Sequence, residues 1–190
     1  MRADEIRAIL ETAGAVRAGH FRLTSGLHSD FFLLCALVMQ HPERAAALAE
    51  AMAGPYRGER VDAVIGPAVG GIILAYELAR HLAARAIFAE KSAGGAMVLR
   101  RGFTLVPGER VLVIEDALTT GGSIRKVIDV VRAARAEVVG AAVLVDRSGG
   151  RVDLGVPVRS LLTLEVNAWE PGQCPLCRAG VPLVEPKEPS

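Results

Sequence analysis

Two adjacent acidic residues, Glu115 and Asp116, stand between a short apolar run and a turn rich in glycine and hydroxyl groups. The turn, residues 119–123, leads into a helical pattern, so backbone N–H groups and the positive end of a helix dipole are available to an anion. This chemistry favours a phosphate group. Because carboxylates repel phosphate, we expect Glu115 and Asp116 to hold neutral sugar hydroxyls, a metal ion or both.

The whole segment, residues 111–123, resembles the motif with which type I phosphoribosyltransferases bind 5-phosphoribosyl-1-pyrophosphate (PRPP), and the match is unbroken over thirteen residues. The resemblance implies that Glu115 and Asp116 hold the ribose 2- and 3-hydroxyls. It also implies a loop that wraps the 5-phosphate and consists of Ala117, Leu118, Thr119, Thr120, Gly121, Gly122 and Ser123. The alternative interpretation is a glycine-rich turn of an ordinary α/β protein.

A second glycine-rich turn, residues 66–71, joins another apolar run to another helical pattern. Its glycines allow the backbone to approach an anion closely. In type I phosphoribosyltransferases the corresponding loop contacts the pyrophosphate leaving group, which here implies Pro67, Ala68, Val69, Gly70 and Gly71. A tight turn that binds nothing is the alternative.

The segment of residues 19–32 resembles the N-terminal hood of orotate phosphoribosyltransferases, which covers the base. The resemblance implies that Phe31 and Phe32 contact the pyrimidine, a role that suits aromatic side chains. The alternative is a phenylalanine pair that belongs to the core. Many family members carry a lysine near the substrates at the position of Thr24, so a cationic contact from that position is not expected here.

Arg147 follows Asp146 at the end of a third apolar run. A guanidinium can grip the planar carboxylate of orotate with two parallel hydrogen bonds. An Asp-Arg pair at this place has that role in the orotate enzymes, and Thr119 is placed to bond the base. A surface ion pair is the alternative for Arg147.

Residues 88–103 correspond to the mobile, lysine-rich loop of the orotate enzymes, but only Lys91 of its basic residues is retained. Arg100 and Arg101 lie nearby and could supply charge to the departing pyrophosphate, which requires cations. We therefore expect Lys91, Arg100 and Arg101 to be the catalytic group. The alternative is a solvated arginine pair on a hairpin.

Cys174 and Cys177 have the spacing of a metal knuckle, but one such pair is only half of a tetrahedral site. Their spacing does not bring Cys35 or any of the four histidines to them, so we expect two unligated thiols. Zinc shared across a dimer and a redox pair stay open. Of the histidines, His28 lies in the hood segment, where an exposed side chain is expected. No Ser/His/Asp arrangement is evident.

These motifs need a scaffold that brings their turns together. Apolar runs predict strands, and amphipathic patterns predict helices; the strands are residues 61–65, 85–89, 111–114 and 138–145, and the helices are residues 4–12, 42–53, 72–82 and 123–134. This alternation predicts an α/β fold with a central parallel sheet flanked by helices, and ligands at the carboxyl ends of the strands. The resemblance specifies a type I phosphoribosyltransferase-like fold with a small N-terminal hood.

Three finer expectations concern the ends of the chain. Asp4 is expected to cap the first helix, residues 31–38 to form a strand, and the residues after Pro182 to form a tail. The length of 190 residues favours a single domain, with a hood mainly of residues 1–40 plus a C-terminal segment and a core of about residues 41–165.

Composition narrows the functional classes. A net charge of +1 gives no strong field toward nucleic acid or membrane, and the charged N-terminus does not read as a signal peptide. We expect a cytoplasmic protein. There is no P-loop lysine pattern and no dinucleotide-binding fingerprint after a strand.

Taken together, the resemblance implies orotate phosphoribosyltransferase activity. Its substrates would be orotate and PRPP, its cofactor Mg²⁺ acting through PRPP, and its assembly a homodimer. One alternative is a purine or uracil phosphoribosyltransferase, which shares the PRPP motif. The other is a PRPP-binding regulator without catalysis, which would carry a DNA-binding domain or a basic RNA face.

Overall fold

The computed structural model describes residues 1–23 and 25–185, so Thr24 lies outside the described part. Its larger sheet contains β3 (Ala63–Pro67), β4 (Arg85–Lys91), β5 (Met97–Leu99), β6 (Arg110–Leu118), β7 (Glu137–Asp146) and β8 (Val158–Thr163). The order is β5-β4-β3-β6-β7-β8, and all neighbours are parallel except β5, which forms an antiparallel hairpin with β4. The predicted central parallel sheet is therefore confirmed.

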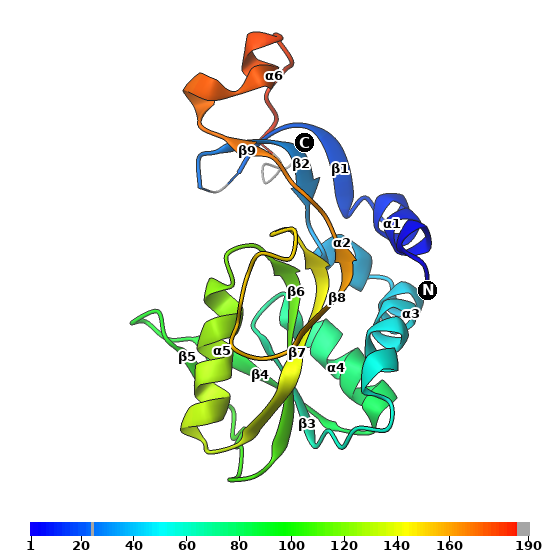
Figure 1. The fold of residues 1–190 in the computed structure, drawn as a ribbon, viewed down its shortest axis with the longest axis vertical. Helices are drawn as coiled ribbons and strands as arrows, with labels where there is room; N and C mark the ends of the chain where they lie inside the picture. The colour runs from blue at the N-terminus through cyan, green and yellow to red at the C-terminus, as the bar shows by residue number, and fades with distance from the viewer. Residues whose placement is uncertain (24, 186–190) are drawn as a thin grey trace.

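Helices cover both faces of this sheet (Figure 1). α3 (Pro42–Ala53) and α4 (Gly71–Leu82) lie on one face, and α5 (Gly122–Ala133) lies on the other. Along β6, Leu112 and Ile114 join the core on the α4 side, whereas Val111 and Val113 join the core on the α5 side. Burial on both faces explains why this strand reads as a continuous apolar run.

A second, three-stranded sheet forms the hood. It contains β1 (Val16–Arg22), β2 (His28–Leu33) and β9 (Ala168–Trp169), in the order β1-β2-β9. The short helices η2 (Pro171–Gln173) and α6 (Pro175–Arg178) follow β9. Because the chain passes from the end of β8 directly to β9, the hood lies beyond the carboxyl end of the larger sheet, at the top of Figure 1.

The remaining helices are α1 (Ala3–Thr12), α2 (Ala36–Met39) and η1 (Gly54–Tyr56). α1 packs Ile6 and Leu10 into the larger core. None of the helices in residues 1–23 and 25–185 is both long enough and apolar enough to span a bilayer.

The three finer expectations for the chain ends need correction. Arg2, not Asp4, occupies the N-cap of α1, where its backbone N–H donates to the Glu5 carboxylate. The expected strand of residues 31–38 ends at Leu33, because the chain turns into α2 and buries Val38 there. The segment after Pro182 is not a free tail as far as it is described, since Val184 bridges to Phe21 of the hood.

Candidate active site

The phosphate loop lies between the end of β6 and the start of α5. Gly121 is the N-cap of α5 and has a φ of 79°, a left-handed conformation that favours glycine. A Cβ atom there would also lie 2.8 Å from Val152 Cγ1, so a side chain does not fit. Glycine therefore lets the chain turn sharply from strand to helix, and the free N–H groups of the first helical turn face the loop.

The loop lines a pocket of about 300 Å³. Besides Glu115 and residues 117–123, the pocket is lined by Lys91, Gly95, Met97 and Lys126. The sequence motif and Lys91 of the β4–β5 hairpin are thus brought to one cavity. Together they combine an anion-binding helix N-terminus with two lysines and a buried acid.

Glu115 is buried and Asp116 is half-buried, and neither carboxylate has a counter-ion in the described part of the chain. Glu115 is 7% exposed, and among the described residues no lysine, arginine or histidine nitrogen lies within 4.0 Å of either carboxylate. Burial and the neighbouring carboxylate of Asp116 raise the pKa of Glu115 to about 8. Burial also raises the pKa of Asp116, although its carboxylate accepts a 2.9 Å hydrogen bond from the Ala117 N–H. Such a pair is poised to accept hydrogen bonds from hydroxyl groups or to bind a cation.

The second glycine turn lies directly against this pair. A Cβ atom on Gly70 would lie 2.7 Å from Asp116 Oδ2, and one on Gly66 would lie 2.7 Å from Ile114 Cδ1. Both glycines are therefore required for the close approach of the β3–α4 turn to β6. The two predicted phosphate loops are neighbours at the carboxyl ends of adjacent strands.

Arg147 also reaches this edge of the sheet. Its backbone N–H donates a 2.8 Å hydrogen bond to the carbonyl of Leu118, which ties it to the phosphate loop. Its side-chain Nε is buried and has no hydrogen-bond partner, and burial lowers the pKa of the guanidinium. A buried guanidinium nitrogen without a partner is costly, so this group is suited to an anion.

The predicted base-contacting phenylalanines lie in β2 and have different environments. Phe32 is 8% exposed, and its ring lies 5.6 Å from the ring of Phe21. Phe31 is only partly buried and packs at the edge of the larger core. Just after β2, the Cys35 thiol lies 3.6 Å from the carbonyl oxygen of Asp116, which connects the hood to the acid pair.

The three basic residues expected to act in catalysis are not brought together. Lys91 lines the pocket, but Arg100 and Arg101 are not among the lining residues. Arg101 instead pairs with Glu90 at 2.6 Å and lies over the Phe88 ring. Lys126, which belongs to none of the motifs, does line the pocket, and its Nζ donates to the Gly95 carbonyl at 2.8 Å. The sequence feature that could have identified Lys126 as a pocket residue is its position one turn into the helix that follows the phosphate loop.

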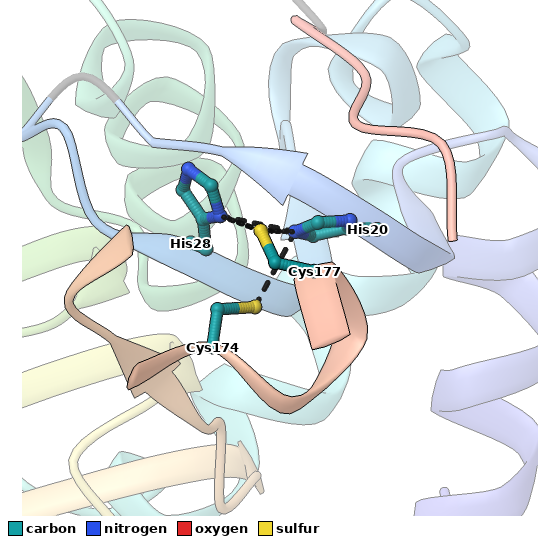
Figure 2. A group of neighbouring side chains, drawn as sticks. All are labelled: His20, His28, Cys174 and Cys177. Atoms are coloured by element: carbon teal, nitrogen blue, oxygen red, sulfur yellow. Dashed lines mark hydrogen bonds between the residues drawn. The ribbon is translucent and has the colours of Figure 1, made fainter. Parts of the chain in front are cut away.

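The prediction that no histidine lies near Cys174 and Cys177 was wrong. His20, His28, Cys174 and Cys177 meet in the hood, away from the pocket, with one ligand atom of each within 4.8 Å of the others (Figure 2). His28 is buried rather than exposed. Sequence spacing could not predict this, because the folded C-terminal segment returns to the β1–β2 hairpin across about 150 residues of chain.

Comparisons with known proteins agree with this geometry. The phosphoribosyl transferase domain family matches residues 38–176. The chain is 53% identical over 186 residues to orotate phosphoribosyltransferase of Pelotomaculum thermopropionicum, covering 98% of this chain and 97% of the relative. It is 50% identical over 186 residues to orotate phosphoribosyltransferase of Caldicellulosiruptor bescii, with the same coverage of 98% and 97%. The crystal structure of orotate phosphoribosyltransferase from Aeropyrum pernix superimposes with a TM-score of 0.71 at 31% identity, covering 84% of this chain and 94% of that one.

Proposed function

The chain belongs to the orotate phosphoribosyltransferase family, and on that premise we propose that it transfers the phosphoribosyl group of PRPP to N1 of orotate. The products of this pentosyl transfer are orotidine 5'-monophosphate and pyrophosphate, a step of pyrimidine biosynthesis. One observation carries the proposal: a buried acid without a basic partner among the described residues, Glu115, lines one pocket together with a helix N-terminus, and the half-buried Asp116 follows it in the chain. A sugar phosphate with free hydroxyls matches both features.

On the donor side, the loop of residues 117–123 holds the 5-phosphate with its backbone N–H groups and hydroxyls. Glu115 and Asp116 accept hydrogen bonds from the ribose hydroxyls. Their burial supports this role, because each acid gains a partner that it lacks in the free protein.

The leaving group is held by the neighbouring turn, Pro67, Ala68, Val69, Gly70 and Gly71, whose backbone lies against Asp116. Lys91 and Lys126 line the same pocket and oppose the negative charge that develops on pyrophosphate. Arg100 and Arg101 would reach the site only if the β4–β5 hairpin and the segment after it move. Positioning and charge stabilisation supply most of the rate enhancement in this account.

On the acceptor side, Arg147 binds the orotate carboxylate. Its unpartnered, buried Nε supports this assignment. Phe31 and Phe32 shape the hood over the base, and Thr119 bonds the ring. These contacts, rather than the PRPP motif, select orotate over a purine or uracil, neither of which carries a carboxylate.

The residues present also suit Mg²⁺ bound together with PRPP. Glu115 and Asp116 offer hard oxygen donors, and no basic side chain of residues 1–23 or 25–185 neutralises them. When bound, Mg²⁺ would neutralise charge on the departing pyrophosphate.

We further propose that the protein acts as a cytoplasmic homodimer. Exposed apolar side chains on and beside α4 support the dimer: Val69 is 82% exposed, Tyr76 64% and Ile73 48%. Light scattering should give twice the monomer mass, and Tyr76→Glu should shift it toward the monomer.

The activity is tested by incubating purified protein with PRPP, Mg²⁺ and one base at a time, and following both the base and the release of pyrophosphate. Orotate should be consumed, whereas uracil, hypoxanthine and adenine should not. Turnover of a purine in place of orotate would overturn the substrate assignment. PRPP binding without turnover of any base would favour the regulator.

A further inference from the structure

Four side chains in the hood form a second chemical centre that the transferase reaction does not use (Figure 2). His20 comes from β1 and His28 from the first position of β2, whereas Cys174 caps α6 and Cys177 lies within it. Three of the four are buried, and Cys177 is exposed. We propose that His20, His28, Cys174 and Cys177 bind one structural zinc ion.

The distances match a tetrahedral zinc site. Zinc bonds of about 2.0–2.1 Å to nitrogen and about 2.3 Å to sulfur separate neighbouring ligand atoms by roughly 3.3–3.8 Å. His20 Nε2 lies 3.1 Å from His28 Nδ1, 3.4 Å from Cys174 Sγ and 3.7 Å from Cys177 Sγ. Cys177 Sγ lies 3.2 Å from His28 Nδ1. Two of these four distances lie within that range and two lie just below it, so only small shifts are needed for the four atoms to surround a single ion.

Hydrogen bonds among these groups explain the cluster less well than a cation does. His20 Nδ1 lies 2.8 Å from the carbonyl oxygen of Val181 and donates its proton there. His20 Nε2 is then unprotonated, and its lone pair faces three other polar atoms, two of them sulfurs. Thiols are weak hydrogen-bond donors, so they satisfy this lone pair poorly. Metal-binding histidines characteristically donate the other ring N–H to a carbonyl or carboxylate, as His20 does.

Few other interactions stabilise the segment around Cys174 and Cys177. Of the described residues 165–185, only Cys174 is buried. Apart from the cluster, the segment contacts the hood through the short β2–β9 pairing, the Val184 bridge and the Ser29 hydroxyl, which donates to the Asn167 carbonyl. Two exposed polar contacts, Arg22 with Glu185 and Asn167 with Asp30, are added to these. So small an apolar core gives little stability, and a metal ion commonly replaces a core in such segments.

The donor set identifies the metal. Two thiolates and two imidazoles select zinc among abundant divalent ions, whereas Mg²⁺ requires oxygen ligands. Four protein ligands leave no open position, so the ion would fasten the C-terminal segment to the β1–β2 hairpin and take no part in chemistry.

The first test is the metal itself. Protein purified without chelators should contain about one zinc ion per chain by elemental analysis, as a closed four-ligand site requires. Cobalt(II) in place of zinc should give the visible absorption of a tetrahedral site together with thiolate-to-cobalt charge transfer. Protein that takes up neither ion would overturn the proposal, and so would an intact mass that reveals a Cys174–Cys177 disulfide.

Variants then assign the ligands. Cys177→Ser and His28→Asn should lose bound zinc and the charge-transfer or ligand-field signal, while Cys177→His, which keeps a ligand atom, should retain zinc. Cys35→Ser and His41→Asn are matched controls outside the cluster and should keep full zinc content. Since Cys177 is exposed, its variant should remain folded by circular dichroism. Unchanged zinc in both ligand variants would overturn the assignment.

Discussion

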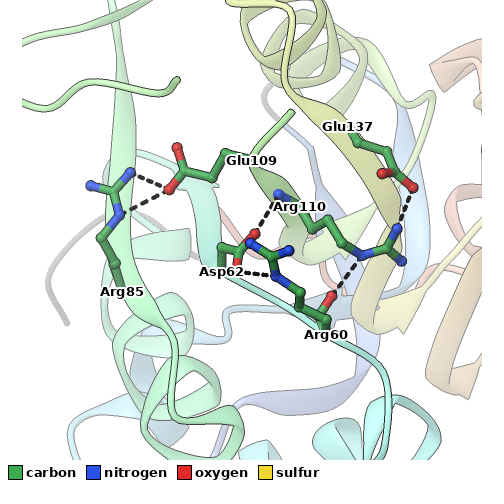
Figure 3. Close-up of polar contacts among 6 residues, drawn as sticks. All are labelled: Arg60, Asp62, Arg85, Glu109, Arg110 and Glu137. Carbon is green, nitrogen blue, oxygen red and sulfur yellow. Dashed lines mark hydrogen bonds and ion pairs between the residues drawn. The ribbon is translucent and has the colours of Figure 1, made fainter. Parts of the chain in front are cut away.

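Carboxylates at the amino ends of the central strands have basic partners, whereas Glu115 and Asp116 at the carboxyl end of β6 have none among the described residues. At the amino ends of the strands every acid drawn in Figure 3 has a basic partner. Glu109, which is 8% exposed, binds Arg85 Nε at 3.0 Å and accepts the Val106 N–H at 3.0 Å. Asp62 binds Arg60 Nε at 2.8 Å and accepts the Arg110 N–H at 2.9 Å, and these hydrogen bonds lower its pKa.

At the carboxyl end of β6, two residues of the same types, Glu115 and Asp116, have no basic partner in the part of the chain that the structure describes. Burial raises the pKa of both Glu115 and Asp116, and no basic side chain of the described residues pairs with either acid. Arg147, a half-buried cation on the same edge, has a buried Nε with no partner. The amino end is therefore arranged for stability, whereas the carboxyl ends of β6 and β7 keep unsatisfied groups of both signs for ligands.

Asp116→Asn should produce the largest effect that separates the two ends. The variant loses charge-assisted hydrogen bonds to the ribose, so PRPP affinity should fall about 10- to 100-fold. Orotate affinity should change far less, and the melting temperature should not fall, because a half-buried acid without a basic partner is removed. Calorimetric titration with each ligand checks this, with Asp129→Asn on the exposed side of α5 as control. Equal losses for both ligands would contradict the ribose role.

Arg147→Ala tests the unpaired cation. The orotate KM should rise about tenfold, since a carboxylate loses its charged partner, while the PRPP KM stays unchanged. Steady-state kinetics with each substrate varied in turn measure both values, and Arg7→Ala on α1 serves as the surface control. An unchanged orotate KM would remove Arg147 from the acceptor site.

Only the carboxyl-end part of this contrast could be predicted from the sequence. Glu115, Asp116 and the loop after them are contiguous, and a local motif of strand, acids and glycines predicts its own structure. The strands and helices of residues 61–146 were predicted to within a few residues for the same reason, apart from β6, which runs on through both acids to Leu118. The paired acids of the amino end come from separate strands, so their partners depend on register, which no local pattern specifies.

A hood of residues 1–40 and a C-terminal segment was expected, but the pairing of its strands was not predicted, for a related reason. β1 shows no regular alternation of buried and exposed residues, and β9 is only two residues long. β1 pairs with β2 in a local hairpin, whereas β9 pairs with β2 from a C-terminal segment far away in sequence. The spacing of Cys174 and Cys177 was visible, but their partners His20 and His28 lie on a hairpin at the other end of the chain.

Glu115→Gln should change how the stability of the protein depends on pH. The pKa of Glu115 in the folded protein, about 8, is above its ordinary value of 4.5, so its stabilising contribution is present at low pH and is lost as pH rises through about 8. The wild type should lose about 1–3 kcal/mol relative to Glu115→Gln between pH 6 and 9. Thermal melts across that range measure this loss.

Asp62→Asn is the matched control for that experiment. The pKa of Asp62 is lowered, so its contribution disappears only on acidification, and its difference from the wild type should be constant between pH 6 and 9. If the difference in stability between the wild type and Glu115→Gln is also constant between pH 6 and 9, Glu115 is already ionised in the free protein.

Glu109→Gln should destabilise the protein and leave the site intact. The buried carboxylate loses its charge toward Arg85 and one acceptor, which should cost about 1–2 kcal/mol of unfolding free energy. The KM values for PRPP and orotate should not change, because the residue lies at the opposite end of the sheet. A loss of PRPP affinity with unchanged stability would contradict the conclusion that the amino end serves stability and the carboxyl end serves ligand binding.

Glu137→Gln should have the smallest effect, and it tests whether pairing alone explains the stability of the amino end. Glu137 pairs with Arg110, as Glu109 pairs with Arg85, but its side chain is 55% exposed and that of Glu109 only 7%. Solvent screens an exposed pair, so the loss should be below about 0.5 kcal/mol and should vanish in high salt. Denaturant unfolding of both variants at low and high salt makes the comparison. If Glu137→Gln costs as much as Glu109→Gln, the amino end is stabilised by its ion pairs as a connected network, and burial of one carboxylate is not the deciding term.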